Sequence, residues 1–172
     1  MINMYHADRE IRDRDVIKAI LDMCDVITIG FHDDDYPYVL PVNFGYEFDD
    51  DLIFYTHHAP VGYKNKLIEK NPKVCVTTYK FMDRIFNDYD NSSHDYRSVM
   101  AYGEMSFIRR DSDEYGKAWS VFCACNGRTV PDTVFQPDFN VLMGKIVCLR
   151  ENVIGKAQRH ITRPDEVPFK IG

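Results

Sequence analysis

Two stretches of the chain repeat their hydrophobic residues at the 3.6-residue period of a helix. In the first, residues 13–24, Asp13 or Asp15 can cap the start. The second, Asp111–Cys125, is followed by Asn126-Gly127, which is typical of a helix end. The hydrophobic faces consist of Val16, Ile17, Ile20, Leu21 and Cys24 in the first stretch and of Tyr115, Ala118, Trp119 and Phe122 in the second. We interpret both faces as structural cover for a sheet.

Shorter hydrophobic runs between turn residues predict about six strands. These runs are Val26–Phe31, Tyr38–Glu47, Leu52–Thr56, Val74–Tyr79, Tyr96–Ile108 and Val141–Arg150. Hairpin-like connections between them outnumber helical crossovers, so the pattern favours a mainly β fold over a doubly wound parallel sheet. We expect a small antiparallel barrel with two to three short helices outside it. Residues 81–95 are predicted to be a loop that covers a site, and the tail from Gly155 to be loosely held.

Two residues inside the predicted strands indicate irregular backbone. Pro41 belongs at a sheet edge or a bulge, where unpaired carbonyls and amides are available to a ligand. The amide of Asn43 beside it suits either the edge of a bound heterocycle or a neighbouring loop. Gly103 indicates a bend or a close backbone approach of the kind that a barrel needs.

Length, charge and composition narrow the class of protein. The 172 residues are in the range of one domain, and we expect residues 1–172 to form one. A net charge of −6 without a basic cluster argues against a nucleic-acid surface. Neither a signal peptide nor a run near the ~18 apolar residues of a membrane helix is visible, which predicts a cytoplasmic protein that does not bind membranes. Five cysteines in apolar patterns indicate reduced thiols, and no ligand spacing predicts a metal site.

The stretch from Tyr55 to Lys64 predicts the end of a strand, a tight polar loop and the start of a helix. Pro60 suits the first turn of that helix and Asn71-Pro72 forbids its continuation, which leaves about three turns. Free amides at a helix N-terminus attract anions. The side chains expected to converge on one anion, most naturally a phosphate, are Thr56, His57, His58 and Lys64.

Six short motifs occur together in one order along the chain. They are Asp13-Arg14-Asp15, Tyr36 to Tyr46, His57-x-Ala59 with Gly62 and Lys64, Asn71 to Cys75, Tyr96-Arg97-Ser98-Val99, and Ile154-Gly155-Lys156. This order resembles the nitroimidazole-resistance family of flavin-binding split-barrel proteins, which is related to pyridoxamine 5′-phosphate oxidase. The resemblance covers about residues 10–156 and leaves a C-terminal tail, 157–172, outside it. It implies a homodimeric split β-barrel of Greek-key type, with a flavin in each cleft between the subunits.

The resemblance also implies which residues bind the cofactor, FMN or, alternatively, FAD. The backbone around Leu40, Pro41, Val42 and Asn43 would contact the isoalloxazine ring. Thr56, His57, His58 and Lys64 would lie near the ribityl chain and phosphate, with Tyr96, Arg97 and Ser98 completing that side. Tyr55 is also expected to bind the cofactor. The chain departs from the family where His58 replaces a usually small residue and where Pro60-Val61 replaces a more polar pair.

The function implied by the resemblance is a flavin-dependent oxidoreductase that reduces nitroaromatic compounds such as nitroimidazole antibiotics. A nicotinamide or a protein partner would supply the electrons. His57 is the candidate proton donor, or else a hydrogen-bond partner of the flavin, since imidazole titrates near neutral pH. The alternative function is a non-catalytic flavin or haem carrier or sensor, in which His57 or His58 would be an axial haem ligand.

Overall fold

The computed structural model describes residues 4–86, 92–136 and 139–158. The strands are β1 (Glu10–Ile11), β2 (Val26–Phe31), β3 (Tyr38–Asn43), β4 (Gly45–Phe48), β5 (Leu52–His58), β6 (Lys73–Phe86), β7 (Ser92–Ile108), β8 (Leu142–Cys148) and β9 (Val153–Ala157). The helices are α1 (Arg14–Asp22), α2 (Tyr63–Lys70) and α3 (Asp113–Cys125), with short 3-10 turns η1 (Ala7–Arg9), η2 (Asp132–Phe135) and η3 (Arg150–Asn152). No helix in these ranges is both long and apolar enough to cross a membrane.

All nine strands belong to one antiparallel sheet that does not close. Its main order is β3-β2-β6-β7-β8-β5-β4, with β9 pairing β7 and β1 beside it. Strands β3 and β4 are separated in sequence only by buried Phe44, yet they lie at opposite ends of this order. The chain therefore crosses the opening of the barrel at Phe44. The prediction of a mainly β split barrel is confirmed, with more strands than the expected six.

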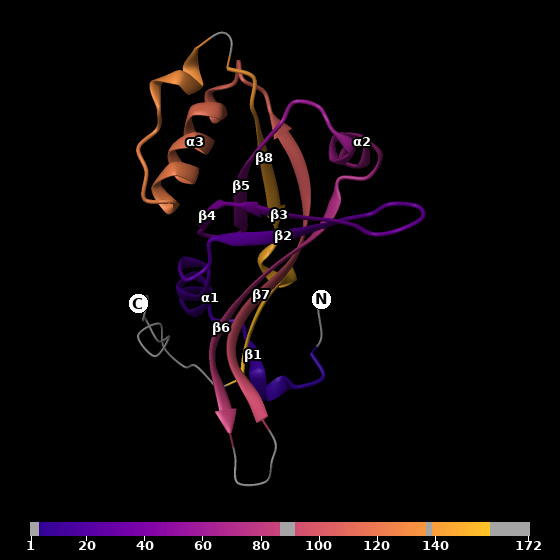
Figure 1. Ribbon diagram of the computed structural model, residues 1–172, viewed down its shortest axis with the longest axis vertical. Coiled ribbons are helices and arrows are strands. Elements are labelled where there is room, and N and C mark those ends of the chain that lie inside the picture. Colours follow the sequence, from indigo (N-terminus) through magenta and orange to yellow (C-terminus); the bar gives the residue numbers. More distant parts are fainter. Residues whose placement is uncertain (1–3, 87–91, 137–138, 159–172) are drawn as a thin grey trace.

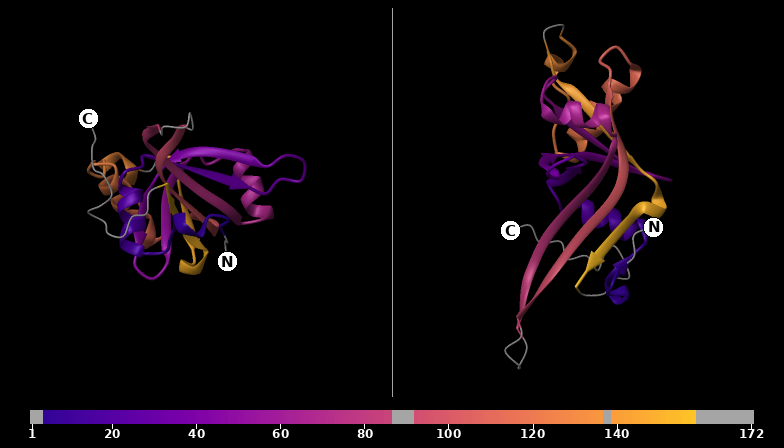
Figure 2. Two further views of the ribbon diagram at one scale, coloured as in Figure 1. Left: turned by 90° about the horizontal axis from the view of Figure 1, so that it is seen from below. Right: turned by 90° about the vertical axis from the view of Figure 1, so that its right-hand side faces the viewer.

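The predicted loop at 81–95 is wrong at both of its ends. Residues 81–86 and 92–95 belong to β6 and β7, which form a long hairpin that extends away from the helices α2 and α3 (Figures 1 and 2). Hydrophobic alternation fades there because this part of the hairpin has little core to face. Its paired backbone, with Arg84 opposite His94, makes it strand nevertheless. Residues 87–91 lie outside the described residues.

The predicted start of the tail, at Gly155, is also wrong. Strand β9 includes Gly155 and pairs with both β1 and β7. A Cβ atom at Gly155 would lie only 3.1 Å from Ile11 and 3.2 Å from Ile17, so a small residue allows this close packing. The sequence Gly155-Lys156 looks polar, but it belongs to a buried strand. The rest of the tail, 159–172, lies outside the described residues.

Two of the helices follow the sequence pattern closely. The side chain of Asp13 accepts hydrogen bonds from the amides of Asp15 and Val16 at 2.9 and 3.0 Å, which confirms the predicted cap of α1. The hydrophobic face of α1 packs into the main core of the sheet. Helix α3 buries Trp119 and its neighbours in a second core against β5 and β8 (Figure 1). Both predicted roles as sheet cover are confirmed.

Helix α2 begins later and is shorter than predicted. Its cap is Gly62, at φ 153° and ψ 170°, a conformation that only glycine adopts readily. Pro60 therefore lies in the preceding loop, and the helix has eight residues. The predicted stop is confirmed, since Asn71 caps the end. Two contacts tie α2 to the barrel: the Tyr63 hydroxyl donates to Asp33 Oδ2 at 2.7 Å, and Lys70 pairs with Asp34.

Candidate functional site

The opening of the barrel exposes two strand edges that lie close in sequence. Within the described residues β3 pairs only with β2, so Leu40–Asn43 form a free edge and Pro41 lies on an edge strand as predicted. On the other side, β4 stops pairing with β5 at Tyr55, and the following residues Thr56–His58 pair only with β8 there. The amide of Asn43 donates to the carbonyl of Asp25 at 3.0 Å, which is the neighbouring-loop alternative.

A polar cluster faces the barrel interior beside this opening. Thr56 and His58 share one face of β5, and their Oγ1 and Nε2 atoms are 2.6 Å apart. Both side chains are buried. Burial, with help from the nearby Lys64 ammonium, lowers the pKa of His58 to about 4. His58 is therefore neutral at pH 7, and one of its ring nitrogens carries a proton while the other accepts.

The ammonium of Lys64 has no acidic partner among the described residues. The residue is only 8 % exposed, and the one hydrogen bond of its ammonium within the described part of the chain, to the carbonyl of Ala59, is long at 3.4 Å. Desolvation lowers its pKa. A buried ammonium normally has a counterion, because removing the charge from water is costly. The positive charge of Lys64 without a counterion, at the first turn of α2, is consistent with a bound anion.

Gly144 on β8 makes room for the cluster. A Cβ atom there would lie 2.8 Å from Thr56 Oγ1, 2.9 Å from His58 Nε2 and 2.7 Å from the Met105 side chain. The His58 ring also meets the edge of Phe107, at 6.0 Å between centroids. Sequence reasoning overlooked Gly144, although an isolated glycine within a strand pattern is a signal of close approach.

Two residues expected to bind the cofactor, Tyr55 and His57, do not face the cluster of Thr56 and His58. Both side chains lie on the opposite face of β5, which is covered by α3. Tyr55 is buried, and its hydroxyl donates to Glu47 Oε2 at 2.9 Å. His57 is exposed, with its ring 5.0 Å from that of Phe122 and 6.1 Å from that of Trp119. The reason is the two-residue period of a strand, which separates neighbours onto opposite faces.

Tyr96, Arg97 and Ser98 lie far from Thr56 within one chain. The register of the sheet aligns Thr56 with Gly144 and Gly144 with Phe107, ten residues along β7 from Arg97. At the rise of a strand this is roughly 30 Å. Arg97 is itself buried and paired with Asp95. The structure therefore divides the expected cofactor residues into three groups: one at the opening, one beneath α3 and one on the hairpin.

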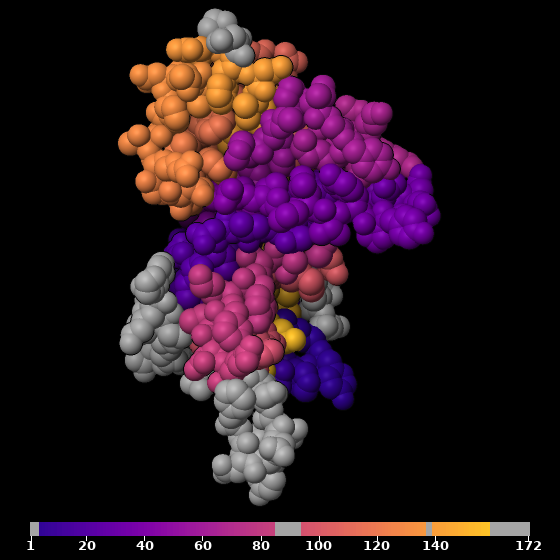
Figure 3. Space-filling model, in the orientation of Figure 1, coloured from indigo at the N-terminus to yellow at the C-terminus, as the bar shows by residue number. Residues whose placement is uncertain are grey.

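The outer face of the sheet, formed by β3, β2, β6 and β7, is exposed and poor in charge at its centre. One row across these strands is Val39, Gly30, Cys75 and Tyr102, and the next is Pro41, Thr28, Thr77 and Met100. Figure 3 shows the violet segment around β3 overhanging the narrower part of the molecule below. These two central rows carry no charged side chain, whereas Lys73 and Glu104 lie farther up the same face.

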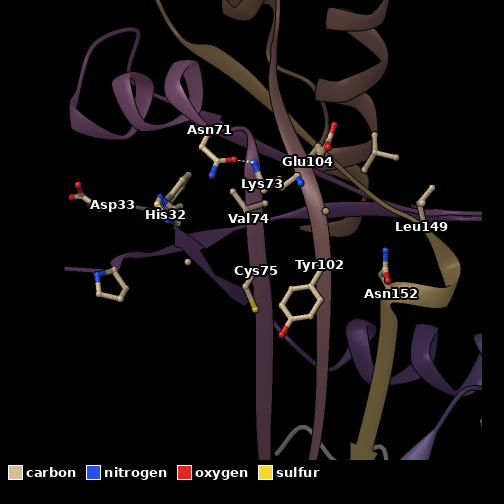
Figure 4. Close-up of a pocket in the computed structure, with 15 residues that line it drawn as sticks. His32, Asp33, Asn71, Lys73, Val74, Cys75, Tyr102, Glu104, Leu149 and Asn152 are labelled. Atoms are coloured by element: carbon tan, nitrogen blue, oxygen red, sulfur yellow. Dashed lines mark hydrogen bonds between the residues drawn. The ribbon is translucent and has the colours of Figure 1, made fainter. Parts of the chain in front are cut away.

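A cavity of about 840 Å³ hollows the upper part of this outer face. Figure 4 shows Cys75 and Tyr102 side by side, with Lys73 and Glu104 above them and Leu149 and Asn152 to one side. Gly103 forms part of the cavity wall. A Cβ atom at this position would lie 2.6 Å from both Cys148 Sγ and the Val147 carbonyl oxygen. The predicted close backbone approach at Gly103 is thereby confirmed.

Comparison with known proteins agrees with this architecture. The sequence profile described as pyridoxamine 5′-phosphate oxidase matches residues 13–133. A solved structure from Bacteroides thetaiotaomicron, assigned to 5-nitroimidazole antibiotic resistance, is 25 % identical with a TM-score of 0.69, covering 91 % of this chain and 96 % of that one. The motifs that resemble the nitroimidazole-resistance family thus have a structural counterpart.

Two further solved structures share the fold at lower identity. The flavocytochrome Anf3 from Azotobacter vinelandii is 21 % identical with a TM-score of 0.68, covering 98 % of this chain and 79 % of that one. The FAD and haem binding protein from Mycobacterium smegmatis is 18 % identical with a TM-score of 0.67, covering 92 % and 78 %. Curated protein sequences give no match. Because the profile matches well over half of this chain, the chain belongs to the pyridoxamine 5′-phosphate oxidase family.

Proposed function

We propose that this chain is a flavin-dependent oxidoreductase that holds FMN at the opening of the barrel and reduces nitroaromatic acceptors. The observation that carries the proposal is the buried Lys64 ammonium, which lacks an acidic partner among the described residues. Lys64 belongs to the first turn of α2, and its charge acts on neutral His58, whose ring contacts the Thr56 hydroxyl. A phosphate would supply the missing negative charge and would accept hydrogen bonds from Lys64, from the Thr56 hydroxyl and from the amides of that first turn.

The other residues at the opening suit the rest of a flavin. Leu40 and Val42 are half-buried against the main core, and the free edge of β3 carries unpaired backbone groups. An apolar wall beside hydrogen-bonding backbone is what a flavin ring requires. When bound, the flavin supplies hydride or electron transfer. FAD is the alternative cofactor, with the same phosphate site.

We propose that the cleft is completed by a second copy of the chain. The hairpin residues Tyr96, Arg97 and Ser98 lie roughly 30 Å from Thr56 along their own sheet, so only a partner's hairpin would bring them to the flavin. The exposed outer face, whose two central rows carry no charged side chain, would provide the surface for this homodimer. Light scattering tests the assembly: we expect a mass of two chains, and a monomer at all concentrations would contradict it.

His57 has a separate role in this proposal. Its exposed ring beside α3 does not face the phosphate donors, and partial burial lowers its pKa. A neutral, exposed imidazole that can take a proton from solvent suits a donor of protons to the acceptor. The proposal further treats residues 1–172 as one cytoplasmic domain, with a nicotinamide or protein electron donor and without a nucleic-acid or membrane partner.

The test is an absorption spectrum of the protein as purified, followed by chromatography of the molecule that heat releases. Paired flavin bands with release of FMN are the expected result, and released FAD would assign the alternative cofactor. A haem Soret band without flavin would favour the carrier function. A colourless protein that takes up neither added flavin nor added haem would contradict the proposal. Turnover of a nitroimidazole with a nicotinamide donor then tests the reaction.

A further inference from the structure

The contact between Thr56 and His58 fixes where the hydroxyl proton of Thr56 can point. The two atoms are 2.6 Å apart, so one of them donates to the other. A threonine hydroxyl has a single proton and a neutral imidazole has a single N–H. If Thr56 donates to His58, the hydroxyl proton is engaged in that hydrogen bond and is not available to another acceptor. If His58 donates through Nε2, the Thr56 proton remains available to another acceptor.

The surroundings of His58 hold its ring in place. Its side chain is 4 % exposed, Phe107 packs against it edge-on, and Gly144 leaves just enough space at Nε2. Lys64 contributes a nearby positive charge. An anion held by Lys64 attracts the Thr56 proton and so favours the arrangement in which His58 Nε2–H donates to Oγ1.

We propose that His58 is a positioning residue for the flavin phosphate: its Nε2–H donates to Thr56 Oγ1 and thereby directs the Thr56 hydroxyl proton to a phosphate oxygen. This inference rests on the proposed phosphate site and adds a role that acts through Thr56, without contact between His58 and the phosphate. It explains why a large polar residue is accommodated on the interior face of β5.

Matched variants separate positioning from packing. His58→Gln keeps an N–H donor at a similar reach, whereas His58→Met has similar length and no donor. The affinities of each variant for FMN and for riboflavin, which lacks the phosphate, are measured by quenching of flavin fluorescence. We expect His58→Met to weaken FMN about tenfold and to leave riboflavin within about twofold, with His58→Gln close to the wild type.

A double-mutant cycle tests the path through Thr56. Thr56→Val removes the hydroxyl with little change of shape, so adding His58→Met to it should cost no further FMN affinity. Equal weakening of FMN and riboflavin by His58→Met, or additive effects in the cycle, would overturn the inference. If the wild type itself fails to prefer FMN over riboflavin, the phosphate site of the proposed function fails instead.

A second measurement does not depend on the folding of variants. The ring-nitrogen shifts of His58 in 15N-labelled wild-type protein report which nitrogen carries the proton. With FMN bound we expect Nε2–H. A neutral ring with its proton on Nδ1 would overturn the inference.

Discussion

The two faces of β5 differ in how the charged groups near them are paired. On the face covered by α3, Tyr55 donates to Glu47, and Glu47 also pairs with Lys117 at 2.8 Å. Near the interior face, the Lys64 ammonium on α2 acts on His58 and, among the described residues, has a long hydrogen bond to a carbonyl and no acidic partner. We infer from this difference that the charges on the first face are balanced within the chain, whereas the charge of Lys64 would be balanced by a bound anion.

The largest expected effect on stability comes from a substitution that adds a side chain against the interior face of β5. Gly144→Val would place a Cβ within 3 Å of Thr56, His58 and Met105, and we expect a loss of about 3 kcal/mol in the free energy of unfolding. Gly30→Val is the control, because its Cβ would lie 3.7 Å from the Cys75 carbonyl, an ordinary contact. Urea unfolding measures both. Equal losses would contradict the idea that the interior face has no spare space.

The second effect is the pH dependence contributed by His58. Burial lowers its pKa to about 4 from 6.5, so between these values the unfolded chain binds more protons than the folded one. Stability is therefore complete above pH 6.5 and is lost as the pH falls. We expect the wild type to lose about 2 kcal/mol more than His58→Gln between pH 7.5 and 5 in urea unfolding. Parallel pH profiles would contradict this.

A smaller effect is expected on the face covered by α3. Tyr55→Phe removes the hydrogen bond to Glu47 but leaves Glu47 paired with Lys117, so we expect a loss of about 1 kcal/mol in stability. FMN affinity, measured by fluorescence titration, should change less than about twofold, since this hydroxyl faces away from the phosphate donors. A tenfold loss of FMN affinity would place Tyr55 at the cofactor and contradict the division between the faces.

The smallest expected effect on cofactor binding is that of His57→Ala. Its exposed ring makes only aromatic contacts with α3, so FMN affinity should stay within about threefold of the wild type. If His57 is the proton donor, turnover of a nitroimidazole falls while FMN affinity is kept. Loss of FMN affinity would instead support the hydrogen-bonding role with the flavin.

The sequence was informative wherever hydrophobic spacing and backbone chemistry act locally. The cap of α1 at Asp13, the edge position of Pro41 and the close approach at Gly103 all follow from residue type. It was misleading where tertiary pairing decides: the hairpin residues 81–86 and the buried strand at Gly155 have weak patterns but paired backbones.

For the candidate site, sequence reasoning found the stretch but not the division within it. Thr56 and His58 are in contact and the charge of Lys64 acts on His58, whereas His57 and Tyr55 lie on the opposite face, because neighbours along a strand alternate between its two faces. The distance of Arg97 from Thr56 depends on the register of three strands, which no local pattern contains.

The central claim is that the Lys64 ammonium binds the phosphate of the flavin. Titration of Lys64→Met with FMN tests this claim most directly. Lys66→Met, an exposed lysine on the same helix, is the matched control. We expect Lys64→Met to weaken FMN about 10- to 100-fold while Lys66→Met stays near the wild type. Removing a buried unpaired charge should also raise the stability of the cofactor-free protein. Equal FMN affinity in the wild type and both variants would contradict the account.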